Sequence, residues 1–181
     1  VLADDDEYWP TFQDRYKDAR VATVSGGAER CHSVLNGLAC LADSAAENDW
    51  VLVHDAARPC LRQQDISALI TALEKSPVGG LLGIPVADTI KQVDAVAVVR
   101  QTVEREGLWR ALTPQMFHLG PLRDALQEAI TRGALVTDEA AAMERAGHRP
   151  LMVQGHADNI KITEPGDLQL AAFYLQSRGA E

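Results

Sequence analysis

The sequence has few cysteines and no regular spacing of metal ligands. Cys31, Cys40 and Cys60 are odd in number and form no C-x-x-C motif, so neither a disulfide framework nor a zinc site is indicated. The five histidines are scattered without an H-E-x-x-H motif, which argues against a histidine metal site. We therefore expect the cysteines to be small core residues in a reducing compartment.

Long apolar runs and an excess of positive charge are also missing. No run approaches the ~20 residues of a membrane helix, and the acidic residues at positions 4–7 are the reverse of a signal peptide. These absences favour a cytoplasmic protein that does not associate with membranes. The net charge of −9 argues against nonspecific binding to nucleic acid, so any phosphorylated substrate must be held by a local cluster of Arg and Lys.

What is present is the composition of a globular α/β protein. The 181 residues are 46% hydrophobic and 24% charged, which suits one domain with a proper core. Strand-like runs alternate with amphipathic helical segments, as in an α/β fold with a mostly parallel sheet. We expect strands at 21–24, 50–53, 80–84 and 160–162, and helices at 31–41, 65–76, 121–133, 137–147 and 163–175.

Residues 86–105 interrupt this alternation and predict a projecting arm. Two strand-like runs, 89–93 and 96–99, flank Asp94 and Ala95 with no helix between them, which is the pattern of a β-hairpin. An isolated hairpin is stable only when something covers its apolar face. The arm is therefore expected to lie on a second subunit, which would make the protein a homodimer.

The segment that follows the expected strand at 50–53 is the most informative one. The strand is apolar without alternation, the pattern of a strand covered on both faces. Asp55 and Arg58 come next, and in open α/β sheets ligands bind beyond the carboxyl ends of the strands. Both side chains are thus candidates to meet a metal, a ribose or a phosphate. The plainer alternative is that Asp55 caps the turn and pairs with Arg58.

Two weaker candidates lie elsewhere. Gly26 and Gly27, between a strand and a helix, let backbone N–H groups approach an anion or a base, and Ser33 can add a hydroxyl, although a tight turn is the simpler alternative. Lys161 lies in an apolar run where its charge needs an anionic partner, with Asp158 three positions before it, unless it is an edge-strand lysine that faces solvent.

Eight short segments, in this order, resemble one family. They are GGAER (26–30), SV (33–34), VHDAARP (53–59), DTIK (88–91), GLW (107–109), LTPQ (112–115), TDEA (137–140) and DNIK (158–161). Residues 26 to about 175 are similar to the 2-C-methyl-D-erythritol 4-phosphate cytidylyltransferases of non-mevalonate isoprenoid biosynthesis. The resemblance implies a Rossmann-like nucleotidyltransferase fold, a three-layer α/β sandwich in a single domain over residues 1–181, whose β-arm at about 86–105 interlocks in a homodimer.

The resemblance also implies a role for each matching position. The reaction would be cytidylyl transfer from CTP to the methylerythritol phosphate, with Mg²⁺ or another divalent cation screening the phosphates. The metal ligands stay open, with Asp55 and Asp158 as candidates. CTP would contact Gly26, Gly27, Ala28, Ser33, Asp55 and Ala56. The polyol phosphate would contact Arg58, Thr89, Arg105, Thr113, Thr137, Asp158 and Lys161, and the catalytic residues would be Arg105, Lys161 and Asp55.

One part of the family pattern has no counterpart in these residues. The family opens with a strand, a glycine-rich loop bearing an Arg, and a Pro-Lys-Gln segment, whereas Val1, Leu2 and Ala3 resemble the end of a later strand. We therefore expect the sequence to be a trimmed piece of a longer chain that is inactive by itself. A fusion partner beyond Glu181 stays open.

Three other functions compete with this one. A cytidylyltransferase for another polyol phosphate, such as ribitol 5-phosphate, would share most of these residues. A noncatalytic nucleotide-binding or dimerisation module would account for the missing loop. A glycosyltransferase would need an Asp-x-Asp motif at a strand end, which Asp4 and Asp6 match only formally within a polar segment.

Overall fold

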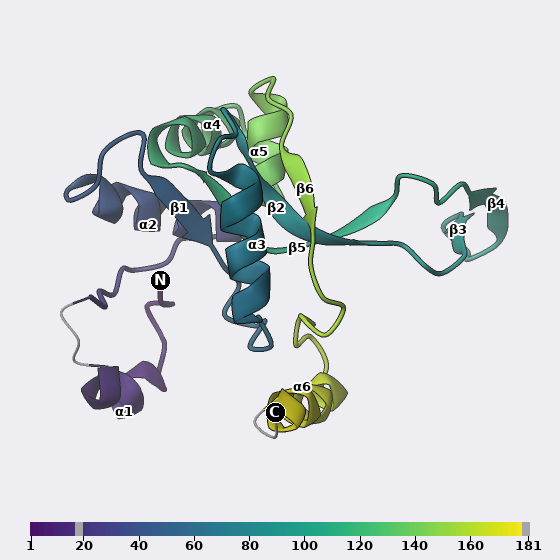
Figure 1. Cartoon of the computed structure of the whole chain (residues 1–181), viewed down its shortest axis with the longest axis horizontal. Coiled ribbons are helices and arrows are strands. Elements are labelled where there is room, and N and C mark those ends of the chain that lie inside the picture. The colour runs from purple at the N-terminus through teal and green to yellow at the C-terminus, as the bar shows by residue number, and fades with distance from the viewer. Residues whose placement is uncertain (17–19, 179–181) are drawn as a thin grey trace. The chain divides into compact units, whose positions relative to one another are not determined.

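The computed structural model describes residues 1–16 and 20–178 and alternates helices with strands (Figure 1). In chain order the elements are α1 (Trp9–Phe12), the 3₁₀ helix η1 (Gln13–Tyr16), α2 (Arg30–Ala42), β1 (Trp50–Val53), α3 (Gln63–Leu73), β2 (Gly79–Pro85), β3 (Ile90–Val93), β4 (Val99–Val103), β5 (Trp109–His118), α4 (Leu119–Thr131), α5 (Glu139–Arg145), β6 (Leu151–Gln154) and α6 (Pro165–Arg178). The main sheet has the strand order β1-β5-β2-β6, and β3 pairs with β4 in a separate sheet. The α/β class predicted from the alternating pattern is therefore confirmed.

The chain forms two compact units. Unit 1 comprises Val1–Val53, Pro77–Gly79 and Met116–Pro150, and unit 2 comprises His54–Ser76, Gly80–Gln115 and Leu151–Glu181. In unit 1, α2 and α5 pack on α4, and each of these three helices contributes buried apolar side chains to the core. In unit 2, α3 packs on β6 and buries Leu69 and Leu73, which their i, i+4 spacing places on one face of the helix. Burial of each such side chain stabilises the fold by roughly 1.5–3 kcal/mol.

Glycine allows β2 and β6 of unit 2 to pair closely. The two strands are parallel, with Gly80 opposite Leu151 and Gly83 opposite Gln154. A Cβ on Gly80 would collide with the carbonyl oxygen of Leu151. A larger residue at position 80 would therefore push the two strands apart.

The predicted β-hairpin is present, although its second strand begins later than predicted. β3 and β4 are antiparallel, with Val93 opposite Val99. Between them, Asp94 Oδ1 accepts the N–H groups of Val96 and Val98, each at 3.0 Å. These side-chain bonds hold the backbone in a turn and keep it out of the ladder. Figure 1 shows the arm extending away from the ends of β2 and β5.

Two predicted strands are wrong. Residues 21–24, all of them described, form no strand, and an isolated bridge made by Leu2 lies beside them. Residues 160–162, also within the described part, are irregular, and Ile162 donates its N–H to the carbonyl of Ala57 in a loop. A short apolar run becomes a strand only where a partner strand is within reach, and the run itself does not provide one.

Two strands escaped prediction because their patterns are atypical. β5 contains Pro114 and the buried polar residues Thr113 and Gln115, so neither alternation nor an apolar run marks it. β6 has only four residues, and Leu151 is half exposed. The short helices α1 and η1 lie in residues for which no element was predicted.

The main helices are present, with shifted ends. α3 begins at Gln63, so Asp65 lies in its first turn and does not cap it. α5 begins after Asp138, whose carboxylate accepts the N–H of Ala141, rather than at Thr137. α4 also begins two residues before the predicted position 121. Within the described ranges, no helix has both the length and the apolar character needed to cross a membrane.

Burial is lower than predicted in two elements. Leu52 of β1 is 40% exposed, so this strand is not covered completely on both faces. In α6, the spacing of Leu168 and Leu175 places both on one face of the helix, but they are 62% and 46% exposed, and Ala171 is the buried residue of the described helix. Apolar spacing indicates which face of an element is apolar, but not whether another element covers that face.

Candidate functional site

The glycine segment of unit 1 forms a tight loop before α2. Gly27 donates its N–H to Ser33 Oγ at 2.9 Å, and Gly26 donates to the carbonyl of Leu2 at 2.6 Å. A Cβ on Gly27 would collide with the Cβ of His32 and lie 3.1 Å from the carbonyl carbon of that residue. The close approach of the loop to α2 therefore requires glycine at position 27.

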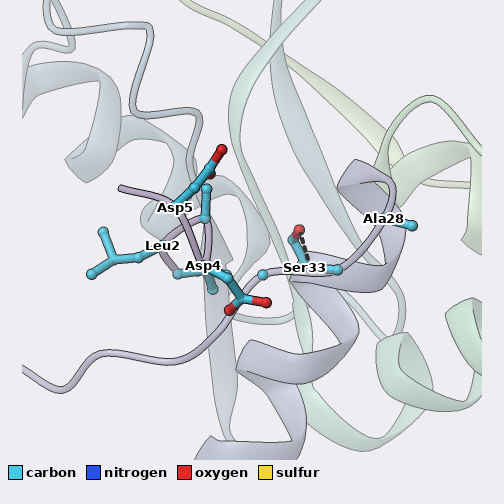
Figure 2. Close-up of a pocket in the computed structure, with 9 residues that line it drawn as sticks. Leu2, Asp4, Asp5, Ala28 and Ser33 are labelled. Atoms are coloured by element: carbon cyan, nitrogen blue, oxygen red, sulfur yellow. Dashed lines mark hydrogen bonds between the residues drawn. The ribbon is translucent and has the colours of Figure 1, made fainter. Parts of the chain in front are cut away.

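A pocket of about 460 Å³ opens beside this loop (Figure 2). It is lined by Val1, Leu2, Ala3, Asp4, Asp5, Gly26, Gly27, Ala28 and Ser33. The lining offers backbone groups, a hydroxyl and two carboxylates, but none of its side chains is cationic. Such a surface suits a neutral polar ring with hydrogen-bond donors better than it suits a phosphate.

An ion pair joins the start of α2 to the start of α5. Arg30 binds Glu139 through both carboxylate oxygens, with Nη1–Oε1 at 2.6 Å and Nη2–Oε2 at 3.1 Å. Glu139 is fully buried, and burial raises its pKa although Arg30 opposes the rise. Because Arg30 follows the glycine loop directly, this pair fixes the end of the loop.

In unit 2 the chain turns after β1 and brings one carboxylate to two cations. Arg58 donates its N–H to the carbonyl of Asp55 at 2.9 Å, which closes the turn, and its Nε lies 3.6 Å from Asp55 Oδ2. Lys161 Nζ lies 3.3 Å from the same oxygen, so Asp55 is the anionic partner that the lysine needed. Asp55 and Arg58 are mostly buried, whereas the Lys161 side chain is 44% exposed. The cluster carries a net positive charge with an accessible ammonium group.

Buried Thr113 links this turn to the segment that carries Lys161. Its Oγ1 accepts the N–H of Asp55 at 3.1 Å and lies 2.9 Å from His54 Nδ1. Its carbonyl accepts Asn159 Nδ2 at 2.8 Å, and the carbonyl of Asn159 accepts Arg58 Nη1 at 2.8 Å. His54 and Asn159 were not among the predicted site residues. Each directly adjoins a predicted aspartate in the sequence, which is the signal that could have found them.

Asp158 is bound by two guanidinium groups. Arg62 Nη2 and Arg178 Nη2 each lie 2.6 Å from Asp158 Oδ2. Burial acts against ionisation of the carboxylate, but the hydrogen bonds from both arginines prevail and lower its pKa. With these partners Asp158 does not fit a magnesium ligand. Among the residues that the structure describes, no group of three or more His, Cys, Asp or Glu could hold a metal ion.

The other predicted residues lie outside the Asp55 cluster. Thr89 and Arg105 are exposed at the base of the arm, where the Arg105 guanidinium donates to the carbonyl of Ala87. Thr137 is exposed in unit 1, in the loop before α5. Ala56 is exposed in the turn that follows β1. Of the predicted residues, the structure therefore gathers Asp55, Arg58, Thr113 and Lys161 in one cluster.

The comparisons with known proteins agree on one family. A family model for 2-C-methyl-D-erythritol 4-phosphate cytidylyltransferase matches residues 1–177. Relatives of that name from Tolumonas auensis and Hahella chejuensis are 50% and 52% identical over 100% and 94% of this chain, which spans 77% and 70% of their lengths. A crystal structure of 4-diphosphocytidyl-2C-methyl-D-erythritol synthase matches with a TM-score of 0.85 and 41% identity, over 97% of this chain and 80% of that one.

The mixed α/β fold is thus the nucleotidyltransferase fold of that crystal structure. More narrowly, the chain belongs to the 2-C-methyl-D-erythritol 4-phosphate cytidylyltransferase family. The resemblance drawn from eight short segments of the sequence is confirmed.

Proposed function

We propose that this protein transfers a cytidylyl group from CTP to 2-C-methyl-D-erythritol 4-phosphate, in non-mevalonate isoprenoid biosynthesis. The observation that carries the proposal is the cluster of Asp55, Arg58 and Lys161 in a chain of this family. Because the chain has a net charge of −9, an anionic substrate needs such a local group of cations. The products are CDP-methylerythritol and pyrophosphate.

In this reaction a phosphate oxygen of the polyol phosphate attacks the α-phosphorus of CTP. The new P–O bond forms as the bond to the oxygen that bridges to the β-phosphate breaks, and pyrophosphate leaves with that electron pair. Catalysis then consists mainly of positioning and charge stabilisation. The Lys161 ammonium holds the substrate phosphate, Arg58 supports the turn that presents Asp55 and Ala56, and Thr113 fixes the backbone of that turn.

The glycine loop takes the nucleoside part of CTP. Backbone groups of Gly26, Gly27 and Ala28 meet the cytosine and ribose, while the Ser33 hydroxyl holds the loop in shape. The place of this loop beside a pocket of about 460 Å³ in unit 1 supports this assignment. Thr137 and the arm residues Thr89 and Arg105 are proposed to contact the methylerythritol phosphate.

Asp55 is the proposed site for a divalent cation, because its cationic partners Arg58 and Lys161 lie at 3.6 and 3.3 Å, whereas both arginines lie 2.6 Å from Asp158 Oδ2. Mg²⁺ is usually held by one or two carboxylates together with the phosphates of its nucleotide. When bound, it would screen the negative charges of the two substrates and of the leaving pyrophosphate. Asp55 would orient the metal-bearing nucleotide and also keep the Lys161 ammonium in place.

We also propose that two copies pair through the arm. All four residues of β3 are exposed, and Val93, Val96 and Val99 are 47%, 78% and 55% exposed. A two-stranded sheet with this much apolar surface needs a partner. The double change Val93→Asp and Val99→Asp should therefore turn a dimer into a monomer in sedimentation velocity. Identical sedimentation of the variant and the unchanged protein would contradict the proposed interface.

The activity is tested by pyrophosphate release that depends on both CTP and Mg²⁺. The 181-residue chain is compared with the same chain extended by any residues that precede it in its reading frame. Methylerythritol phosphate and ribitol 5-phosphate serve as the two acceptors. We expect release from the extended chain, faster with methylerythritol phosphate. The 181 residues alone should be inactive, because the glycine-rich loop of the family is not among them.

Each other outcome selects an alternative. Faster release with ribitol 5-phosphate would favour a cytidylyltransferase for that polyol. No release with either acceptor, from a folded extended chain that still binds CTP, would favour a noncatalytic nucleotide-binding module. The cytoplasmic location stays a prediction.

A further inference from the structure

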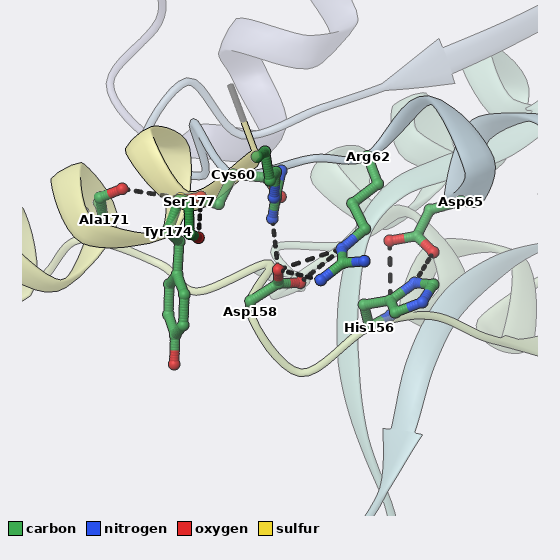
Figure 3. Close-up of polar contacts among 9 residues, drawn as sticks. Cys60, Arg62, Asp65, His156, Asp158, Ala171, Tyr174 and Ser177 are labelled. Carbon is green, nitrogen blue, oxygen red and sulfur yellow. Dashed lines mark hydrogen bonds and ion pairs between the residues drawn. The ribbon is translucent and has the colours of Figure 1, made fainter. Parts of the chain in front are cut away.

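Asp158 lies at the centre of a charge cluster that the proposed chemistry does not use (Figure 3). Its Oδ1 accepts Arg62 Nε at 3.2 Å, and its Oδ2 accepts Arg62 Nη2 and Arg178 Nη2, each at 2.6 Å. Asp158 is 9% exposed, whereas the Arg62 and Arg178 side chains are 34% and 23% exposed, so the contacts are only partly shielded from water. We call Asp158, Arg62 and Arg178 the Asp158 clamp.

The clamp connects three parts of unit 2. Arg62 directly precedes α3, Asp158 lies in the segment after β6, and Arg178 is the last residue of α6. Arg178 Nη2 also donates to the carbonyl of Cys60 at 2.8 Å, and Cys60 Sγ donates to the carbonyl of Ala171 at 3.6 Å. These bonds fasten the segment after β6 against both helices.

That segment has little backbone structure of its own to hold it. Residues 155–164 contain no helix or strand, although all of them are described. Asn159 and Lys161, one and three residues after Asp158, make the contacts to Thr113 and Asp55. The N–H of Ile162 donates to the carbonyl of Ala57 at 2.8 Å, but no ladder of backbone bonds holds the segment, so the position of Lys161 depends on this bond together with the side-chain contacts along the segment.

A second contact fastens the beginning of the same segment. His156 Nδ1 lies 2.6 Å from Oδ1 of Asp65, which is buried in the first turn of α3 (Figure 3). The His156 N–H also reaches Asp65 Oδ2 at 3.4 Å. The segment is therefore tied to the start of α3 at two points, two residues apart, just before Lys161.

We propose that Asp158 is a positioning residue, which binds Arg62 and Arg178 and thereby holds Lys161 where its ammonium meets Asp55 and the substrate phosphate. The contact between Lys161 and the substrate phosphate rests on the proposed function. The contact between Lys161 and Asp55 does not depend on it. Asp158 itself touches neither substrate, because both arginines occupy its carboxylate. A displacement of about 1 Å in a group that positions substrate can cost on the order of a hundredfold in rate.

The reactivity of Lys161 tests the proposal without an activity assay. Lysines of the folded protein are acylated briefly, and the modification rates of Lys161 and of exposed Lys75 are read by peptide mass spectrometry. We expect Asp158→Asn to raise the rate at Lys161 roughly fivefold, the effect of losing a half-exposed ion pair, and to leave Lys75 unchanged. Asp158→Glu should recover part of the protection. Equal Lys161 rates in Asp158→Asn and the unchanged protein would overturn the proposal.

Arg123→Gln is the matched control, because it removes an arginine ion pair, with Glu47, in unit 1. It should change neither lysine. If Asp158→Asn does not fold, Arg62→Lys keeps the charge but loses the bidentate contact, and should show a smaller shift in the same direction. An unchanged Lys161 rate in folded Arg62→Lys would then count against the proposal.

Kinetics supply the second readout, in whichever form of the protein releases pyrophosphate. Asp158→Asn should lower kcat by roughly ten- to a hundredfold, raise KM for the polyol phosphate, and leave KM for CTP unchanged. Equal loss of affinity for both substrates would indicate general damage and overturn the positioning role. If the unchanged protein releases no pyrophosphate, the proposed function fails, and the Lys161 rates still decide the inference.

Discussion

The glycine loop of unit 1 and the Asp55 cluster of unit 2 offer a ligand different kinds of groups. The loop presents backbone groups, with Gly27 pressed against His32 and held by the Ser33 hydroxyl. The cluster presents side chains, with one carboxylate between a mostly buried Arg58 and a half-exposed Lys161. The loop should therefore be sensitive to the size of its residues, whereas the cluster should be sensitive to their charge.

Each region lies near a buried carboxylate that pairs with arginine: Glu139 near the glycine loop, and Asp158 near the Asp55 cluster. The pKa values of these two carboxylates are shifted in opposite directions. Burial of Glu139 outweighs its single arginine partner, and its pKa is raised. Asp158 has two arginine partners, and its pKa is lowered. Glu139 is fully buried with one arginine partner, whereas Asp158 is 9% exposed with two, so both the depth of burial and the number of cations contribute to the opposite pKa shifts.

Lys161→Ala should have the largest effect, because it removes the exposed charge of the cluster. We expect kcat for cytidylyl transfer to fall by roughly 10²–10³-fold, the usual cost of losing a group that stabilises developing charge. CTP affinity, measured by calorimetry, should not change. Lys75→Ala is the matched control on an exposed lysine of the same unit. Normal turnover in Lys161→Ala would refute the role of Lys161.

Arg30→Gln should cause the next largest loss, in stability rather than in chemistry. Glu139 would remain buried without its partner, at a cost of about 3 kcal/mol in the free energy of unfolding. Its pKa, already raised, should rise further, so the ionised form would be disfavoured in the folded state. A carboxyl group with a raised folded pKa contributes stability at low pH that is lost as the pH rises through that value.

Urea unfolding of Arg30→Gln at pH 5 and pH 8 checks this prediction. The deficit should be larger at pH 8, and Arg30→Gln/Glu139→Gln should abolish the difference between the two pH values. A deficit that does not vary with pH would mean that the charge of Glu139 is not its cause.

Gly27→Ala should produce a smaller effect, confined to the nucleotide. The new Cβ would overlap His32, and relief of such overpacking costs typically 1–3 kcal/mol. Part of that cost should appear as roughly tenfold weaker CTP binding as the loop shifts. Gly166→Ala is the control, because a Cβ there has no atom within 4 Å. Unaltered CTP affinity in Gly27→Ala would show that the shape of the loop is not needed.

Ser33→Ala should have the smallest effect of the four. It removes the acceptor of the Gly27 N–H, a hydrogen bond worth about 1 kcal/mol. CTP binding should weaken by about fivefold, and Ser33→Thr, which keeps the hydroxyl, should restore most of it. A loss as large as that of Lys161→Ala would mean that the hydroxyl contacts the substrate directly.

Much of the fold could be predicted where the pattern is local. The spacing of Leu69 and Leu73 marked α3, and the strand-like runs on either side of Asp94 marked the hairpin. β5 could not be predicted, because its buried polar residues become favourable only through bonds to residues distant in sequence. Thr113 is the clear case, with partners 46 to 59 positions away.

The candidate site divides in the same way. Asp55 and Arg58 could be paired from the sequence, since both lie in one turn. The partners of Lys161 and Asp158 could not, because Asp55, Arg62 and Arg178 are between 20 and 106 positions away from them in the chain. Asp158 was consequently predicted to meet substrate or metal, although its carboxylate is bound by arginines.

The sequence by itself determined the α/β class, the arm, the glycine loop and the family, because each rests on residue type and order within short segments. Only the tertiary structure decided which carboxylate faces which cation. This pairing depends on how segments distant in the sequence pack together. It determines how strongly burial and opposite charge each shift the pKa of a carboxyl group. The sequence indicates that Asp55 and Asp158 lie in segments that could bind a ligand. In the folded chain, Asp55 forms an ion pair with Lys161, and Asp158 forms ion pairs with Arg62 and Arg178.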